Sequence, residues 1–400
     1  MKLTKAIVAI ALMATALTSW AQDEQSGVKD DFNPITTGVT SLSITPDARG
    51  ASMGDLGAAT EPDVNSQFWN PSKYAFAYSQ AGVSLSYTPW LRKIVNDIYL
   101  ANLAGYYKIG GNDNQAVSAS LRYFNLGDVL YSEPGDISGA GASMSIHPFE
   151  MAVDLGYSRK LSEKFAMGVV LRYIYSDMGS ANSVGESMTA SAFAADLSGY
   201  YTTYPIIGRN ECQWSFGFNL SNIGSKVNYN DDNPAFLPAN IKLGTAFTFP
   251  LADYNFLTLA LDANKMLVPA KPRQNDPEYW TEEGLDEEAF SQAEQDWKDK
   301  SSIAGIFDSF GDNLGKRITY SLGAEYNYNQ QFFLRGGYYY ESKYAGNRQY
   351  FGLGAGFSLN VIKIDASYMI ATAQNSPLDQ TLRFTLSFDM DGIKGLFGRN

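Results

Sequence analysis

The sequence offers few side chains that could carry out catalysis. It contains one histidine, His147, which precedes Pro148, and one cysteine, Cys212. A hydrolase that uses a Ser-His-acid triad would have to use His147 as its general base. The chain contains no Gly-x-Ser-x-Gly sequence, no histidine pair that could bind zinc and no phosphate-binding loop. We therefore predict that the protein is not an enzyme, and a lipid A deacylase built on His147 is the least favoured alternative.

Acidic residues provide no convincing metal site. The pairs Glu282-Glu283 and Glu287-Glu288 are adjacent in the sequence and cannot converge on one helical face, so solvated charge is the simpler interpretation. Asn230-Asp231-Asp232-Asn233 is a weak cation candidate, but such clusters are more often turns. The single cysteine excludes an intramolecular disulfide and any cysteine-based metal site. We predict neither metal nor cofactor.

Composition narrows the class of protein. The net charge of −12 argues against nucleic acid as a partner. With 45% hydrophobic and 18% charged residues and a mean hydropathy of −0.21, the chain resembles neither a helical membrane protein nor a disordered one. Its 26 Tyr, 23 Phe and 36 Gly fit a membrane barrel with aromatic girdles and a thin lumen wall.

Hydrophobic alternation with a period of two dominates the C-terminal part of the chain, in 317–328, 349–359 and 381–390. One phase carries large apolar residues, such as Phe351, Leu353, Phe384 and Leu386. The other carries Gly, Ser and single charges, such as Arg383 and Thr385. A barrel that is apolar outside and polar inside fits this pattern, because it can span lipid with every backbone group paired.

We predict an all-β membrane protein, a 14-stranded antiparallel outer-membrane β-barrel with a small N-terminal plug. The expected strands are 82–88, 97–108, 115–125, 150–160, 164–175, 190–202, 212–220, 239–249, 256–265, 317–328, 331–341, 349–359, 361–370 and 381–390. Connections after even-numbered strands are mostly short. Those after odd-numbered strands, including 126–149, 176–189, 221–238 and 266–316, are mostly long. Short periplasmic turns and long external loops are typical of such barrels.

The N-terminus predicts export. Residues 1–21 have the basic start, short apolar core and small-x-small cleavage site of a secretory signal peptide. No later apolar run reaches the ~18 residues that a membrane helix needs. We expect residues 22–80 to form a periplasmic lead-in (22–45) and the plug, residues 81–390 to form the barrel, and residues 391–400 to form a periplasmic tail.

The predicted plug contains a run of small residues, 46–59, and a helix start at Asn70-Pro71. The strands opposite it carry charges in the lumen phase. Two interpretations stay open for these charges: ion pairing between wall and plug, or a polar lining that guides a solute. The charges are Arg122, Asp154, Arg172, Asp196, Asp262, Arg317, Glu325, Arg335, Lys363, Asp365 and Arg383.

The longest expected external loop, 267–316, is strongly acidic. Counted from Met266 to Lys316, it holds twelve acids and five bases, and so contributes −7 of the net −12. Trp280, Phe290 and Trp297 fall near helical spacing. The segment is either a solvated helical cap or a docking surface on which these aromatic residues contact cargo or a partner.

The N-terminal motifs resemble a known family. The chain is similar to the long-chain fatty acid transporter (FadL) superfamily in its signal peptide, its Ala-Arg-Gly-x-x-Met-Gly segment, its Asn-Pro helix start and its fourteen strands. Within that superfamily, residues 46–59, 61–65, 69–76 and 83–91 resemble the PorV family of the Bacteroidota type IX secretion system. Ser72 departs from the Ala that usually follows Asn-Pro in the transporters. The plug motif is Arg49, Gly50, Met53, Gly54, Trp69, Asn70 and Pro71.

The resemblance implies a non-enzymatic role. A member would associate with the SprA-type translocon barrel and bind cargo proteins through their C-terminal signal domain. It would then deliver them to an attachment complex that contains PorU. It would reside in the outer membrane after Sec-type export. The alternative is a FadL-like channel for uptake of hydrophobic small molecules.

Overall fold

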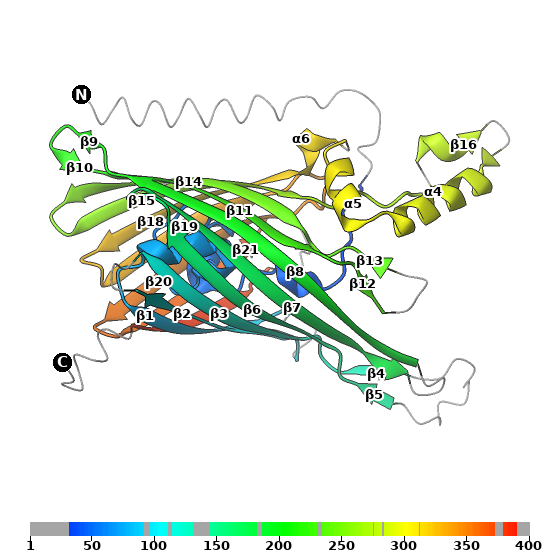
Figure 1. Ribbon diagram of the computed structural model, residues 1–400, viewed down its shortest axis with the longest axis horizontal. Coiled ribbons are helices and arrows are strands. Elements are labelled where there is room, and N and C mark those ends of the chain that lie inside the picture. Colours follow the sequence, from blue (N-terminus) through cyan, green and yellow to red (C-terminus); the bar gives the residue numbers. More distant parts are fainter. Residues whose placement is uncertain are drawn as a thin grey trace. The chain divides into compact units, whose positions relative to one another are not determined.

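A computed structural model of the chain shows one closed β-barrel with helical segments inside it and at one of its ends (Figure 1). It describes residues 32–91, 97–110, 114–131, 144–181, 186–229, 234–274, 276–281, 284–311, 313–372 and 379–389. Residues from Asn33 onward belong to one unit. The expected signal peptide, the first residues of the lead-in and the tail lie outside the described residues, as do 230–233 and 282–283.

The barrel consists of fourteen antiparallel strands, and its first strand pairs with its last, so that every strand has two neighbours. The strands are β1 (Ala81–Pro89), β2 (Tyr99–Ile109), β3 (Gln115–Asn125), β6 (Phe149–Lys160), β7 (Phe165–Ala181), β8 (Glu186–Thr203), β11 (Gln213–Gly224), β14 (Asn240–Ala252), β15 (Asn255–Met266), β18 (Ile318–Tyr328), β19 (Phe332–Tyr340), β20 (Gln349–Leu359), β21 (Ile362–Ala371) and β22 (Leu382–Asp389). The predicted fold class is confirmed.

The expected sidedness of the wall is also confirmed. Phe351, Leu353 and Phe384 are 49%, 50% and 48% exposed, whereas Arg383 and Thr385 in the opposite phase are each 1% exposed. Large apolar side chains therefore cover the outer surface, and polar and small ones line the lumen. This distribution is that of a barrel surrounded by lipid.

The two ends of the barrel differ. We call the end with the short connections the turn end; there, the three residues Asn329–Gln331 join β18 to β19, and Asn329 and Gln330 have positive φ of 52° and 54°. The opposite end, the loop end, carries the connections after odd-numbered strands. These contain the small strands β4 (Val129–Tyr131), β5 (Met144–Ile146), β12 (Val227–Asn228), β13 (Pro234–Ala235), β16 (Trp280–Thr281) and β17 (Gly284–Leu285).

One expected loop is wrong. We predicted a long connection over 176–189, but β7 continues to Ala181 and β8 begins at Glu186. The two strands form the longest pair in the wall, with a register shift between Asp177 and Ser180. Polar residues such as Ser176 and Ser187 do not end a strand when ladder hydrogen bonds satisfy the backbone. A further small hairpin, β9 (Ile206–Ile207) with β10 (Asn210–Glu211), lies at the turn end.

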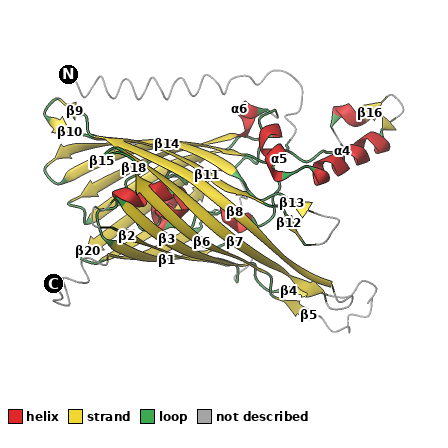
Figure 2. Cartoon of the chain, in the orientation of Figure 1, coloured by secondary structure: helices red, strands yellow, loops and turns green. Residues whose placement is uncertain are grey.

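The helices are short and occupy two places in the chain (Figure 2). The N-terminal group comprises η2 (Thr40–Ser43), α2 (Ala48–Ser52), α3 (Ser66–Trp69) and η3 (Pro71–Phe76). The group between β15 and β18 comprises η4 (Pro277–Tyr279), α4 (Glu287–Asp299), α5 (Ser302–Asp308) and α6 (Leu314–Arg317). Within the described residues, none of the helices has the length and hydropathy needed to cross a membrane.

The N-terminal segment follows an unexpected path. The backbone N–H of Asn33 donates to the carbonyl of Tyr344 (2.8 Å), and its own carbonyl accepts from Arg317 (2.9 Å). Both partners lie at the loop end, whereas the lead-in over residues 22–45 was expected on the periplasmic, turn-end side. That expectation is wrong for residues 33–45. The chain passes down the lumen from the loop end and reaches the turn end only near Gln80, whose carbonyl accepts from the N–H of Lys108 (2.8 Å).

Candidate functional site in the lumen and at the loop end

The plug is organised around Trp69. Its indole N–H donates to Asp47 (2.7 Å), and the other oxygen of that carboxylate accepts from the N–H of Gly50 (2.8 Å) as the N-cap of α2. The ring lies against Gly50 and Gly57, where an added Cβ would come within 2.2 and 2.5 Å of ring atoms. Burial, followed by the charge of Asp63, raises the pKa of Asp47 to about 6.

Glycines in the wall let the plug backbone approach the strands closely. A Cβ on Gly337 of β19 would lie 2.0 Å from the carbonyl carbon of Met53, and one on Gly217 of β11 would lie 1.9 Å from the oxygen of Ala58. Gly323 and Gly352 make similar approaches to Met53 and to α2. Any larger side chain at these positions would displace the plug. At these positions the thin lumen wall that we expected consists of glycines in close contact with the plug backbone.

Arg49 joins the plug to the wall. Its Nε and Nη2 donate to the two carboxylate oxygens of Glu325 on β18 (3.0 and 2.9 Å). Its Nη1 donates to Asp63 (2.9 Å) and to the carbonyl of Glu61 (3.0 Å) within the plug. The side chains of Arg49 and Glu325 are 9% and 4% exposed. A buried, bidentate pair of this kind fixes both distance and orientation.

The Arg49 pair belongs to a longer chain of charges. Arg335 on β19 also donates to Glu325 (2.5 Å) and reaches Asp365 on β21 (2.6 Å). Lys363 stands nearby with its ammonium 4.1 Å from the ring centre of Phe333. Alternating signs offset the desolvation that each buried charge would suffer alone. We call Asp63, Arg49, Glu325, Arg335 and Asp365 the latch.

Three further charged side chains of the wall contact different parts of the plug. Asp262 on β15 accepts from the N–H groups of Gly57 and Ala58 (2.8 and 3.0 Å). Arg122 on β3 donates to the carbonyl oxygens of Ser41 and Ile44, and the latter contact is 2.9 Å. Lys242 lies 4.2 Å from the ring centre of Trp69. These contacts support the interpretation that lumen charges pair with the plug.

Another cluster lies entirely within the wall. Arg172 on β7 donates to Asp154 (2.7 and 2.9 Å) on one side and to Asp196 (3.0 and 3.2 Å) on the other. Asp196 also accepts from the N–H of Asn222 (2.8 Å), at the bulge of β11. Pairing between wall strands stiffens the barrel. Only some of the charged lumen residues therefore bind the plug.

The turn-end half of the plug starts at Asn70. Its side chain accepts from the N–H of Ser72 and caps η3, which has Pro71 in its first turn as predicted. Its amide donates to the carbonyls of Ala58 and Gly199 (2.8 and 2.9 Å). Lys73 is fully buried and donates to the carbonyl of Gly57 (2.9 Å). Burial lowers the pKa of Lys73 to about 8.

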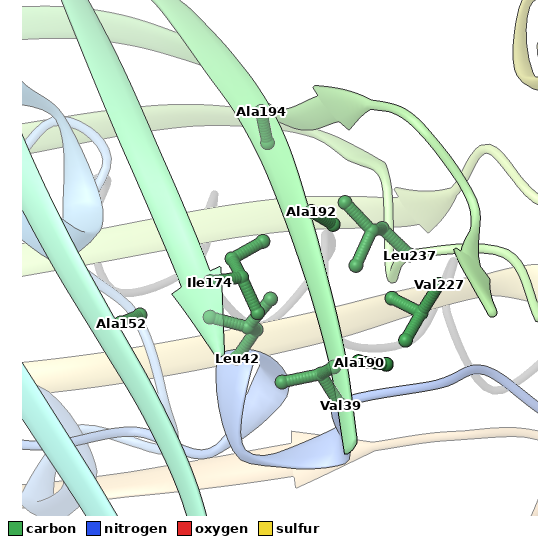
Figure 3. Close-up of a cluster of buried hydrophobic side chains, with 9 residues drawn as sticks. All are labelled: Val39, Leu42, Ala152, Ile174, Ala190, Ala192, Ala194, Val227 and Leu237. Carbon is green, nitrogen blue, oxygen red and sulfur yellow. The ribbon is translucent and has the colours of Figure 1, made fainter. Parts of the chain in front are cut away.

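The loop-end half of the plug is held by an apolar cluster (Figure 3). Val39, the N-cap of η2, and Leu42, within η2, pack against Ile174 and the alanines of β8, and against Val227 and Leu237 of the β11–β14 connection. In the same turn, the backbone N–H of Ser41 donates to the carboxylate of Glu150 on β6 (2.8 Å). The plug therefore touches both the wall and a connection of the loop end.

The three predicted contact residues of the acidic loop differ in environment. Trp297 is 9% exposed; it packs edge-on against Phe236 (5.2 Å between ring centres) and donates to the carbonyl of Pro269 (3.2 Å). Phe290 is partly buried against Tyr279. Trp280 begins β16 and is not helical, contrary to the helical spacing that we inferred. In this conformation Trp297 fastens α4 to the loop-end rim.

The residues considered for catalysis stay apart. His147 is exposed, and its Nδ1 faces the carboxylate of Asp128. Cys212 is buried. In the part of the chain that the structure describes, no three His, Cys, Asp or Glu side chains are grouped so that they could hold a metal ion. The candidate cluster 230–233 lies outside that part.

Sequence reasoning found the plug motif but missed several of its partners. Asp47, Asp63, Lys73, Glu150 and Lys242 were not singled out, although all bind or neighbour the plug. Asp47 had a readable signal, because Asp directly before a run of small helix-forming residues is a preferred N-cap. The others had none: Asp63 and Lys73 bind plug residues 14 and 16 positions away, and Glu150 and Lys242 lie on wall strands far from the plug in the sequence.

These features define an outer-membrane β-barrel whose lumen is filled by its own N-terminal segment. The model of the family described as "Type IX secretion system protein PorV" matches residues 27–273, more than half of the chain. The chain therefore belongs to the PorV family, as its motifs suggested. A comparison with curated proteins finds no match.

Solved structures agree on the fold. The crystal structure of the Ralstonia pickettii toluene transporter TbuX matches with a TM-score of 0.50 at 12% identity, over 88% of this chain and 99% of that one. A Pseudomonas aeruginosa FadL homologue matches with a TM-score of 0.43 at 11% identity, over 90% of this chain and 100% of that one. At 12% identity the likeness to TbuX extends to the fold alone.

Proposed function

We propose that the protein is a non-enzymatic, cargo-binding barrel of the type IX secretion system. In this role it receives proteins that carry the C-terminal signal domain at the SprA-type translocon barrel. It then passes them to the attachment complex that contains PorU. Membership of the PorV family is the observation that carries the proposal. The proposal also includes Sec-type export directed by residues 1–21 and a loop end that faces the exterior of the cell.

Two structural features support this role. The lumen contains a plug held by buried ion pairs and by close backbone contacts with wall glycines. The loop end has folded connections, among them α4 and α5 fastened through Trp297. A protein that holds a folded cargo domain needs a sealed membrane anchor and structured contacts on one side.

Deletion and complementation test the proposal. In cells that lack the gene, signal-bearing cargo should remain in the periplasm or leave the surface unattached, and the wild-type gene should restore attachment. Unchanged surface cargo in the deletion strain contradicts the proposal. Purification of the tagged protein from detergent-solubilised outer membrane should recover the translocon barrel or signal-bearing cargo.

A matched pair of variants locates the contact. In one, a Gly-Ser linker replaces α4 (287–299) at the loop end; in the other, a tight turn replaces 206–211 at the turn end. We expect the first variant to fail in cargo attachment and the second to succeed. If the first also succeeds, α4 is not the cargo contact.

The FadL-like fold supports a second function, uptake of hydrophobic small molecules. Cells with and without the protein should then differ in uptake of labelled fatty acids or aromatic compounds. A purified monomer with bound lipid and without secretion partners would favour this alternative over cargo binding.

A further inference from the structure

A stripe of four large, exposed apolar side chains runs along α5, the residues that follow it and the start of α6. Ile303, Phe307, Phe310 and Leu314 are spaced by four, three and four residues, and they are 67%, 71%, 48% and 43% exposed. Ile303 and Phe307 are four residues apart on one side of α5 (Ser302–Asp308), whereas Phe310 follows in the connection and Leu314 begins α6. In water, such a run of large exposed side chains would be a liability, so a surface that covers them is expected.

The opposite side of α5 is fixed to the barrel. Gly305 is buried against Phe236 and Pro269, where an added Cβ would lie 2.8 and 3.1 Å away. Ile306 packs against the apolar cluster that includes Phe236 and Trp297. The stripe is therefore held in a set orientation and cannot turn inward without breaking these contacts.

Lys265 shows on which side of the wall the stripe lies. It follows Leu261 and Ala263 in the outward phase of β15 and pairs with Ile318 of β18. Its ammonium nevertheless is buried, because it donates to the carbonyl of Ser309 (2.8 Å) and lies 5.1 Å from the ring centre of Phe310. The end of α5 therefore covers the outer surface of the wall at the loop-end rim.

The stripe continues directly into the lipid-facing surface. Leu314 precedes Ile318 by four residues, and the outward positions that follow are Tyr320 and Leu322, which are 37% and 56% exposed. Tyr320 pairs with Tyr340, another outward tyrosine. Tyrosines at such a level mark the boundary between hydrocarbon and headgroups. The stripe therefore lies at the depth where amphipathic helices rest in the interface.

We propose that Ile303, Phe307, Phe310 and Leu314 insert into the interfacial layer of the outer leaflet, so that α5 and α6 form a lipid-binding anchor beside the barrel. Lipid fits the observations better than a protein, because the stripe is continuous with a surface that lipid already covers. The anchor fixes the height and tilt of the loop end. This proposal does not depend on whether the barrel serves secretion or uptake.

Fluorescence quenching tests the anchor. The variant Phe307→Cys, in a Cys212→Ser background, is labelled with an environment-sensitive dye and placed in phosphatidylcholine nanodiscs. Matched positions are Ser291→Cys on the exposed side of α4, as the aqueous reference, and Leu322→Cys on the wall, as the lipid reference. Heat-modifiable mobility on gels checks that each variant folds.

We expect the dye at position 307 to emit at shorter wavelength than at 291. Its emission should also be lost to a lipid that carries a nitroxide near the headgroup, as at position 322. The variant Ile303→Cys should behave in the same way. Equal quenching at 307 and 291 overturns the proposal. So does a dye that stays unquenched in lipid and becomes shielded only when solubilised outer-membrane proteins are added, because a protein would then cover the stripe.

Discussion

Removal of Arg49 should release the plug. The variant Arg49→Met keeps most of the side-chain length but loses the guanidinium that joins Asp63 to Glu325. Loss of one partner from a buried pair typically costs about 3–5 kcal/mol. Glu325 keeps Arg335 at 2.5 Å, so we expect the lower value, about 3 kcal/mol. At about 1.4 kcal/mol per factor of ten, this shifts the plug equilibrium toward opening by roughly a hundredfold.

Thiol labelling measures this shift. Ser52, at the end of α2, is fully buried, and Ser52→Cys in a Cys212→Ser background places one thiol in the plug where it faces Gly354 of β20. When reclosing outpaces labelling, the rate of reaction with a maleimide is proportional to the open fraction. The Arg49→Met variant should therefore label about a hundredfold faster than its parent.

Controls separate the latch from general destabilisation. Lys271→Met breaks the half-exposed pair with Glu294, which is worth at most about 1 kcal/mol, so labelling should change less than about tenfold. Adding Glu325→Gln to Arg49→Met should cost less than the sum of the two single changes. If Arg49→Met labels at the parental rate, or Lys271→Met labels as fast, the latch does not hold the plug.

Three other outcomes follow from the structure. Gly337→Val should impair folding of the barrel around its plug, whereas Gly336→Val should be tolerated. The reason is that a Cβ at 337 would lie 2.0 Å from Met53, while at 336 the nearest atom is 3.8 Å away. Heat-modifiable mobility on gels measures folding of both variants. The pKa of Asp47 is raised from 3.8 to about 6, so the folded plug binds this proton more tightly than the unfolded one, and stability should fall as pH rises from about 4 to 6. The measurement is the labelling rate of Ser52→Cys at each pH, divided by the rate of an exposed thiol. Asp47→Asn should make this normalised rate less dependent on pH. If the pH dependence is unchanged, a group other than Asp47 causes it. An epitope inserted directly before Asn33 should be reached by antibody on intact cells, because Asn33 is bonded to Tyr344 and Arg317 at the loop end; detection only after permeabilisation would reverse the assigned orientation.

The wall could be predicted from the sequence because its signals are local. Alternation within a single strand decides which residues face lipid, so Phe384 and Arg383 could be assigned to opposite sides without knowledge of their neighbours. The hairpin register then follows from short turns such as Asn329–Gln331. Only at Ser176–Ser187 did local polarity mislead, because ladder hydrogen bonds extend β7 and β8 through polar residues.

The plug contacts could not be predicted in the same way. Arg49 and Glu325 are 276 residues apart, and only closure of the barrel brings them together. Likewise, nothing in a polar segment tells from which end it enters the lumen. Asn33 is placed at the loop end by Tyr344 and Arg317, which are also distant in the sequence. Local pattern therefore identified the lumen charges, and the family resemblance identified the motif residues, but neither gave their pairing.

The fastening of the plug also bears on the choice between the two functions. Complete withdrawal of the plug would break the Arg49 pair, the bonds of Asp262 to Gly57 and Ala58, and those of Asn70 to the wall, all of them buried. A channel would have to bypass most of this cost by a partial rearrangement, so weakening the latch should speed solute uptake. In a cargo carrier the loop end makes the contact, and Arg49→Met leaves the loop end intact, so the same variant should leave cargo attachment unchanged. The Arg49→Met variant therefore separates the two functions within one strain.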